Sequence, residues 1–213
     1  MNRLRIRFKR GEEIKYISHL DIIRLWQRSF RRAGIALAYS EGFNPHPRLA
    51  LASPLALGVT SEAELMDIYL ERPMSAAGFT TAVAGCLPPG LEIMQAVAVA
   101  PLLPSMQSQL RLAEYRVRVA VPAGFDIQAA VTTLMRKDSL PWQHQRDTGK
   151  KSYDLRKLVE EIRLCGEGGG EAVVDMRLRC DSAGSGRPEQ VLKALGLGTP
   201  LAVHRTRLIL QTF

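Results

Sequence analysis

Cysteine is scarce in this chain of 213 residues, which contains only Cys86, Cys165 and Cys180. An odd number of widely separated thiols argues against a disulfide framework, and their spacing is not that of paired zinc ligands. We expect these cysteines to be small core residues. No set of His, Cys and carboxylate residues has metal-ligand spacing either, so the sequence predicts no metal site and no cofactor in this chain.

Long apolar runs are also missing. No segment approaches the roughly 18 residues that a membrane-spanning helix needs, and Met1–Arg7 has no apolar signal core. We therefore expect a cytoplasmic protein that does not bind membranes. Hydrophobic residues still make up 46% of the chain, which is enough to bury the core of one large domain or of two small ones.

The charge of the chain is unevenly distributed around a net value of +8. Residues 1–48 contain eleven Lys and Arg against four Asp and Glu, residues 49–110 contain one against five, and residues 111–213 contain seventeen against twelve. Positive charge is thus concentrated at both ends of the sequence. A basic field raises the rate of encounter with phosphate polyanions, although it also serves solubility, and we favour a nucleic-acid partner.

The first half of the chain predicts one βαββαβ unit. Residues 3–9 alternate between apolar and basic side chains, which is typical of a half-buried strand. Ser18 and Asp21 form a capping-box-like pair at the start of an amphipathic helix that Gly34 ends. The remaining elements are expected as strands at 49–52 and 65–70, a helix at 75–86 and a strand at 91–99.

The second half repeats this order less regularly. We expect strands at 115–121, 173–180 and 201–210, and helices at 125–136 and 188–195. For residues 142–165 we expect a strand near Trp142 followed by an irregular or helical insertion. The predicted fold class is α+β, with two ferredoxin-like domains in tandem at residues 1–100 and 114–213 and a linker at 101–113.

Residues 39–48 form the most distinctive loop. Asn44 and His46 each precede a proline and are therefore restricted to extended backbone, while Gly42 provides a flexible corner. Such a stiff segment is costly for a plain connector. We predict a loop site made of Tyr39, Gly42, Phe43, Asn44 and His46.

Arginines recur on the outward faces of predicted elements in both halves. RNA-recognition sheets stack bases on aromatic residues at such strands, so we expect these arginines to bind phosphates instead. An alternative is that they pair with Glu114 and Asp175 and face a partner. The predicted RNA contacts are Arg3, Arg5, Arg7, Arg24, Arg28, Arg31, Arg32, Arg48, Arg116, Arg118, Arg177 and Arg179.

Two histidines are candidates for catalysis. His19 falls in the first helical turn, where the helix dipole favours a neutral imidazole that can accept a proton. His46 lies in the stiff loop. A pair of imidazoles near basic side chains can cleave RNA by general acid and base catalysis without a metal, whereas the simpler interpretation is that both histidines only bond to backbone.

Four segments together resemble the radical-SAM-linked protein family, a bacterial domain of unknown function: Tyr16–Asp21, Arg31–Gly34, Tyr39–Pro47 and Pro54–Val59. The resemblance covers most of the chain, with its specific motifs in the first half. It implies a radical-SAM protein as partner and a role in RNA or ribosome biology, with tRNA or rRNA as the RNA. This sequence has no Cys-x-x-x-Cys-x-x-Cys motif, so any radical chemistry belongs to the partner.

A more distant likeness, at the level of the fold, is to the repeat-associated RNA-processing proteins of CRISPR systems. We expect an RNA-binding accessory protein that presents RNA to a radical-SAM enzyme for modification, and an accessory subunit rather than an enzyme. Two alternatives remain open. One is a metal-independent endoribonuclease, and the other is a pure protein-interaction subunit.

Overall fold

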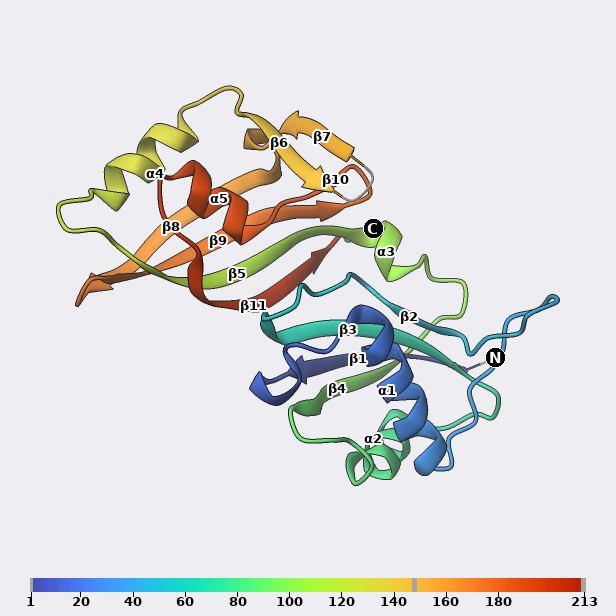
Figure 1. Cartoon of the computed structure of the whole chain (residues 1–213). Helices are drawn as coiled ribbons and strands as arrows, with labels where there is room; N and C mark the ends of the chain where they lie inside the picture. The colour runs from blue at the N-terminus through green and yellow to red at the C-terminus, as the bar shows by residue number, and fades with distance from the viewer. Residues whose placement is uncertain (1, 147–148, 212–213) are drawn as a thin grey trace. The chain divides into compact units, whose positions relative to one another are not determined.

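The computed structural model describes residues 2–146 and 149–211 and divides them into two compact units (Figure 1). Unit 1 comprises the chain up to Leu110, and unit 2 comprises Arg111–Gln211. None of the helices within these described ranges combines the length and the apolar composition that crossing a membrane requires.

Unit 1 has the ferredoxin-like order that the sequence predicts. Its elements are β1 (Asn2–Arg10), η1 (Glu12–Ile14), α1 (His19–Arg32), β2 (Leu49–Leu51), β3 (Thr60–Leu70), α2 (Ala76–Ala84), β4 (Leu91–Val99) and α3 (Met106–Gln109). The strands form an antiparallel sheet in the order β2–β3–β1–β4. The two central strands are therefore the first and third of the repeat, as a split βαβ fold requires.

The core of unit 1 lies between one face of this sheet and the helices α1 and α2. Trp26 of α1 meets Phe8 of β1 edge to face, with 5.1 Å between ring centroids, and stacks on Phe30 at 5.3 Å. Phe30 in turn contacts Phe79 of α2. Each such aromatic pair contributes about 0.5–1.5 kcal/mol beyond its buried area, so this series fixes both helices on the same sheet face.

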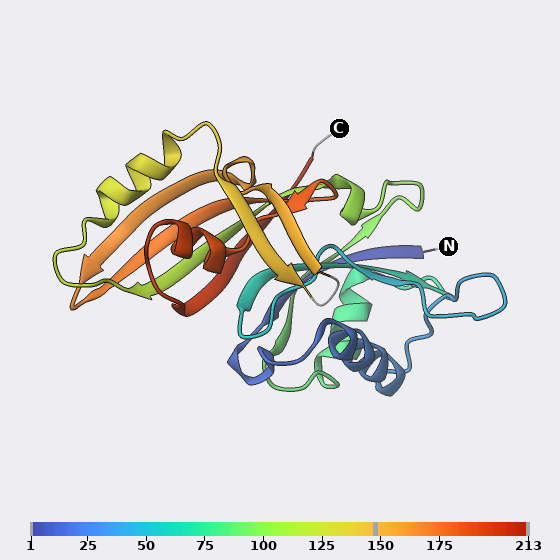
Figure 2. The same cartoon turned by 45° about the horizontal axis from the view of Figure 1, so that its top comes forward.

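Unit 2 repeats the order with one insertion. Its elements are β5 (Leu110–Ala120), α4 (Ile127–Met135), β6 (Pro141–Arg146), β7 (Gly149–Asp154), η2 (Arg156–Leu158), β8 (Val159–Gly168), β9 (Glu171–Asp181), β10 (Gly184–Ser185), α5 (Pro188–Ala194) and β11 (Pro200–Leu210). Its main strands lie in the order β8–β9–β5–β11, which matches that of unit 1 position by position, and β10 also pairs with β9. The hairpin of β6 and β7 is separate from this sheet, and Figure 2 shows it beside α5.

The prediction for residues 142–165 is wrong in two respects. The strand near Trp142 belongs to the inserted hairpin, and β8 takes the second strand position where a helical or irregular insertion was expected. The pairing of β8 with β9 shifts register between Val159 and Glu161 and again between Leu164 and Gly166. Each bulge interrupts the two-residue alternation by which a strand is recognised in a sequence.

Two smaller expectations also changed. Cys180 is buried as expected, but Cys86 is only half-buried and Cys165 is exposed, because it lies on the open face of β8. The segment 101–113, expected to be a linker, contains α3 and the first residues of β5.

Candidate nucleic-acid interface

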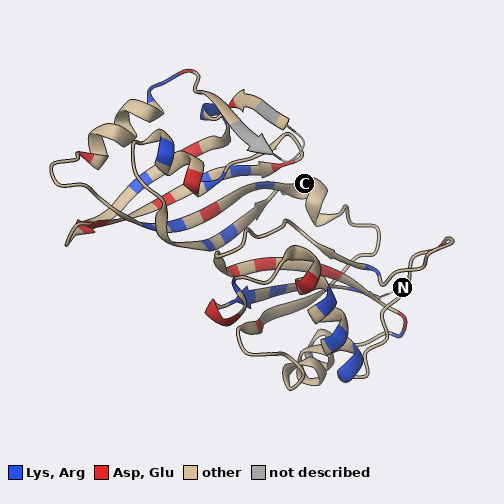
Figure 3. Ribbon diagram, viewed as in Figure 1, with Lys and Arg blue, Asp and Glu red and all other residues tan. Residues whose placement is uncertain are grey.

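The solvent face of α1 carries four exposed arginines in a stripe. Ser18 caps the helix by accepting a hydrogen bond from the Asp21 N–H at 3.2 Å, and its hydroxyl donates to the Asp21 carboxylate at 2.7 Å, which confirms the predicted capping pair. Trp26 and Phe30 turn one side of the helix to the core. The helical period therefore places the arginines on the opposite side, and Figure 3 colours the basic positions of α1 blue. They are Arg24, Arg28, Arg31 and Arg32, which we call the α1 stripe.

The charge of the α1 stripe is largely uncompensated. Arg24 pairs with Asp21 at 2.9 Å, and hydrogen bonds from Ser18 and then from Arg24 lower the pKa of the Asp21 carboxyl. Among the described residues, Arg28, Arg31 and Arg32 form no ion pair within 4 Å. Four cations thus face one carboxylate, which leaves a local excess of positive charge on this helix.

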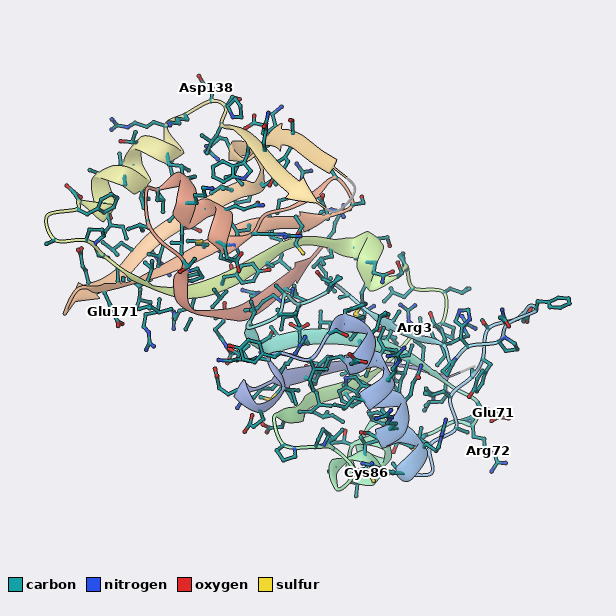
Figure 4. All side chains as sticks on the ribbon, viewed as in Figure 1. Arg3, Glu71, Arg72, Cys86, Asp138 and Glu171 are labelled. Atoms are coloured by element: carbon teal, nitrogen blue, oxygen red, sulfur yellow. The ribbon has the colours of Figure 1, made fainter. Side chains whose placement is uncertain are left out.

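The β1 arginines do not form the exposed basic face that the sequence predicts. Arg3, labelled in Figure 4, is only 2% exposed, because its guanidinium binds the buried carboxylate of Asp67 on β3 and the carbonyls of Leu103 and Pro104. Arg5 binds the same carboxylate at 2.9 Å. Only Arg7 of the three is exposed, and it donates to a backbone carbonyl of β3. We therefore remove Arg3 and Arg5 from the RNA-contact set.

The arginines of unit 2 lie in a neutral network on the open face of its sheet. Arg116 pairs with Asp175 at 2.9 Å, and Arg177 pairs with Glu114 at 2.8 Å, which is the alternative that the sequence left open. The hydrogen bond from Arg116 is the main cause that lowers the pKa of Asp175. Five arginines and five carboxylates form this network: Arg116, Arg118, Arg163, Arg177 and Arg179 with Glu114, Glu161, Glu171, Asp175 and Asp181.

This network gives the open face of unit 2 almost no net charge. Red and blue residues alternate across β5, β9 and β8 in Figure 3. Phosphate binding there would compete with existing ion pairs, whereas at Arg28, Arg31 and Arg32 it would not. The two arginine surfaces are therefore not equivalent, although their sequences look alike.

The loop at residues 39–48 is a narrow projection with a firmly held base. Tyr39 and Pro47 form an isolated antiparallel β-bridge. The Ser40 N–H donates to the His46 carbonyl at 2.9 Å, and the Arg48 N–H donates to the Ala38 carbonyl at 2.7 Å. In Figure 1 this projection is the loop that connects α1 to β2 and extends away from unit 1. The two arms of the loop are therefore paired, in agreement with the stiffness that the sequence predicts.

The base of the loop stacks on Tyr69 of β3. The Arg48 guanidinium lies 4.0 Å from the centroid of the Tyr69 ring, and Arg3 lies 5.5 Å from the same ring. Arg48 is half-buried, so its contact with Tyr69 orients its guanidinium at the foot of the loop. Tyr69 therefore links Arg48, at the base of the projection, to Arg3 of the buried Arg3–Asp67 pair.

At the outer end of the loop, Gly42 has φ +121°, a conformation that favours glycine, and Phe43 is fully exposed. The His46 N–H donates to Ser40 Oγ at 3.1 Å, and His46 Nδ1 lies 3.0 Å from the Asn44 carbonyl oxygen and 3.3 Å from Ser40 Oγ. The imidazole therefore contributes to the shape of the loop while it remains exposed.

His19 and His46 lie at opposite ends of unit 1. The guanidinium of Arg10 binds the Ile17 carbonyl, which places the start of α1 at one end of β1. The other end of β1 faces Tyr69, whose backbone holds the loop base. Because α1 has 14 residues, it spans about 20 Å between these ends. The two imidazoles cannot act together on one phosphate, which argues against the endoribonuclease alternative.

Sequence reasoning missed Asp67, Arg10 and an exposed apolar patch. Asp67 is the only carboxylate within residues 65–70 of β3, and a buried carboxylate needs cations nearby, so its position could have indicated the Arg3 and Arg5 pairs. Arg10 ends the alternating segment and is buried. The patch contains the exposed side chains of Tyr16, Leu20 and Leu57, and only the structure brings Gly58, the neighbour of Leu57, next to the Tyr16 ring.

The described residues contain no group of three or more His, Cys, Asp or Glu side chains that could hold a metal ion. The arrangement instead offers exposed guanidinium groups on α1, an aromatic loop tip and an apolar patch. These groups can bind an anionic polymer and planar or apolar surfaces, and none of them is paired for proton transfer at one atom.

The fold is similar to that of larger solved proteins. A chain in the crystal structure of a Cbf5–Nop10–Gar1 complex matches with a TM-score of 0.56 and 9% identity over 96% of this chain and 48% of that chain. A chain in the archaeal box H/ACA sRNP Nop10–Cbf5 complex matches with a TM-score of 0.47 and 10% identity, over 95% and 46% of the two chains. This protein thus spans about half the length of the solved chains it matches.

At these identities the likeness concerns the fold alone. None of the curated proteins matches this sequence. The model of one protein family matches residues 3–188, which is most of the chain. The protein belongs to that family, DUF2344, described as an uncharacterized protein conserved in bacteria.

Proposed function

We propose that this protein is an RNA-binding accessory protein and that the α1 stripe is where RNA phosphates bind. One observation carries the proposal: among the described residues Arg28, Arg31 and Arg32 of α1 form no ion pair, whereas the five arginines of the unit 2 network face five carboxylates. Unmatched guanidinium groups gain the most from phosphate, because binding breaks no ion pair and releases counterions from the nucleic acid.

The spacing of the stripe suits a polymer of phosphates. Arg24, Arg28 and Arg31 follow one another at helical intervals of four and three residues. Their Cα positions are thus separated by about 4.5–6 Å along the helix axis. Long side chains at this spacing can reach successive phosphates of one strand, and they would bind without reading the base sequence.

The proposed partner is a radical-SAM enzyme. This part of the proposal rests on the resemblance to the radical-SAM-linked family of the four segments Tyr16–Asp21, Arg31–Gly34, Tyr39–Pro47 and Pro54–Val59. In this account the present chain binds RNA, tRNA or rRNA, and the partner supplies the iron–sulfur cluster and the chemistry. The loop at residues 39–48 is the proposed second contact, either with the RNA or with the partner.

The test measures RNA affinity as a function of salt concentration for two variants that lose the same charge. One variant replaces Arg28, Arg31 and Arg32 by Gln, and the matched control replaces Arg116, Arg118 and Arg177 by Gln. Each lost contact with a single strand should reduce the log–log salt slope by about 0.7, so we expect the α1 variant to lose about two units and much of its affinity. Equal losses in the two variants, or a larger loss in the control, would place the RNA elsewhere.

A further inference from the structure

An exposed apolar patch lies at the start of α1, next to the α1 stripe. Its large side chains are Tyr16, 73% exposed, Leu20, 61% exposed, and Leu57, 61% exposed. Leu20 is one helical turn before Arg24, so it continues the line of the stripe toward the N-terminal end of the helix. Leu57 arrives from the loop before β3, since the neighbouring Gly58 lies against the Tyr16 ring.

Hydrogen bonds from Arg10 and from Gly58 hold the turn that carries Tyr16. Arg10 is buried, and its guanidinium donates to the carbonyls of Ile14 at 3.3 Å and of Ile17. The Gly58 N–H donates to the Lys15 carbonyl at 2.9 Å. Gly58 itself has φ +79°, which disfavours a side chain at this position. Tyr16 is therefore presented to solvent by a fixed backbone.

The unmatched cations nearest in sequence to the patch are those of the α1 stripe. The Lys15 ammonium lies 5.3 Å from the centroid of the Tyr16 ring, but it is paired with Glu12 at 2.7 Å, so it is not counted among them. The α1 stripe begins one turn beyond Leu20. An aromatic ring beside a line of cations is the combination that binds single-stranded nucleic acid, with phosphates on the cations and a base on the ring.

We propose that Tyr16 is a stacking platform for one unpaired RNA base, with Leu20 and Leu57 at its sides. This inference rests on the proposed function, because the α1 stripe must hold the strand. It names the substrate class as single-stranded RNA, since the faces of bases inside a duplex are already stacked and cannot reach a protein ring. Arg10 acts as a positioning residue for this platform.

The experiment compares two RNA probes by fluorescence anisotropy: an eight-nucleotide single strand of mixed sequence, and a blunt duplex of the same length. Stacking on one aromatic residue is worth enough that Tyr16→Ala should weaken single-strand binding at least about five-fold. The salt slope and the duplex affinity should stay unchanged, and Tyr16→Phe should bind like the unmodified protein. Leu201→Ala, at an exposed apolar position in unit 2, is the control.

Each of the other outcomes contradicts either the stacking platform or the proposed function. If Tyr16→Ala keeps its single-strand affinity while the α1 triple variant loses affinity and slope, the platform is refuted and RNA binding by α1 stands. If neither variant changes RNA binding, the proposed function itself fails. If Tyr16→Ala binds both RNA probes normally but no longer binds the radical-SAM protein, the patch is a protein interface and the inference is overturned. A melting curve of Tyr16→Ala confirms that the variant is folded.

Discussion

Arginine has two different roles in this protein, and the carboxylate opposite each arginine decides between them. Asp67 lies opposite Arg5 in the pairing of β3 with β1, and it draws both Arg3 and Arg5 into ion pairs. No comparable carboxylate lies among Arg28, Arg31 and Arg32 in the described part of the chain. Residue type alone therefore does not distinguish a structural arginine from a phosphate ligand.

Replacing Arg3 should destabilise the protein strongly. Arg3→Met would leave Asp67 with Arg5 alone and would leave the carbonyls of Leu103 and Pro104 without their donor. We expect a loss of about 3–5 kcal/mol in the free energy of unfolding, the cost of breaking a buried ion pair from one side. Urea denaturation of Arg3→Met and of the unmodified protein measures this difference in the free energy of unfolding.

The matched control for Arg3 is Arg7→Met, in the same strand but exposed. It should change the free energy of unfolding by no more than about 0.5 kcal/mol. Similar losses in both variants would show that burial does not set the role of Arg3.

The loop site is tested by separating the imidazole of His46 from the hydrogen bond that it makes. His46→Ala removes both, whereas Ser40→Ala removes the hydroxyl that His46 contacts and keeps the imidazole. Because His46 is exposed, we expect a stability change within about 0.5 kcal/mol together with loss of RNA binding or modification. Melting curves measure the change in stability, and RNA titrations measure the change in RNA affinity.

The two loop variants should differ if the imidazole is used directly. In that case Ser40→Ala stays functional and His46→Ala does not. Equal losses in both variants would mean that His46 only shapes the loop.

At the scale of the element, regular periodicity was predictable and bulged strands were not. Alternation in β1 and the Ser18–Asp21 pair gave the first strand and helix of unit 1 directly. β8 was missed because its two register shifts hide the alternation. The α1 stripe could be predicted from helical spacing, but the ion pairs of β5 and β9 depend on cross-strand register, which a single sequence does not specify.

Acid should weaken unit 2 through its carboxylates. Hydrogen bonds lower the pKa of Asp175, chiefly from Arg116, and of Asp154, chiefly from the Leu140 N–H. A carboxyl whose pKa is lower in the folded state stabilises the protein above its unfolded value, and this contribution is lost as pH falls through the folded value. We therefore expect the urea concentration at the midpoint of unfolding to decrease once the pH is lowered below about 4, near the ordinary pKa of Asp.

The variant Asp175→Asn isolates this effect in the full chain. It should be less stable than the unmodified protein at pH 7, and the difference should shrink as pH approaches 3, because the unmodified protein loses the same ion pairs. Asp138, exposed beyond α4 and labelled in Figure 4, provides the control variant Asp138→Asn. If the difference in the free energy of unfolding between Asp175→Asn and the unmodified protein stayed constant with pH, the acid effect could not be assigned to the Asp175 carboxylate.

At the scale of the whole molecule, two units of the same topology differ in surface charge. Unit 1 carries the unmatched arginines of α1, and unit 2 carries a balanced network on its open face. The overall charge of +8 predicts a polyanion as partner, but the sequence does not say which surface carries the excess. That information depends on which side chains the fold pairs.

The proposed partner protein should bind through the segment 49–100, in which five Asp and Glu residues stand against one Arg. Among the described residues, β4 pairs only with β1, and its exposed side includes Met94 and Val97. An unpaired apolar edge is a ready template for another chain. Co-expression with the proposed radical-SAM partner should give one complex on a sizing column, and Val97→Lys should weaken this complex. Two separate peaks at micromolar concentrations would count against a stable complex.

The most direct test of the central claim is arginine footprinting of the unmodified protein with and without RNA. Phenylglyoxal modifies exposed guanidinium groups, and mass spectrometry reads the extent at each position. If RNA lies along α1, it should protect Arg28, Arg31 and Arg32 and leave Arg116 and Arg118 as reactive as before. Protection of Arg116 and Arg118 with no protection on α1 would contradict the account.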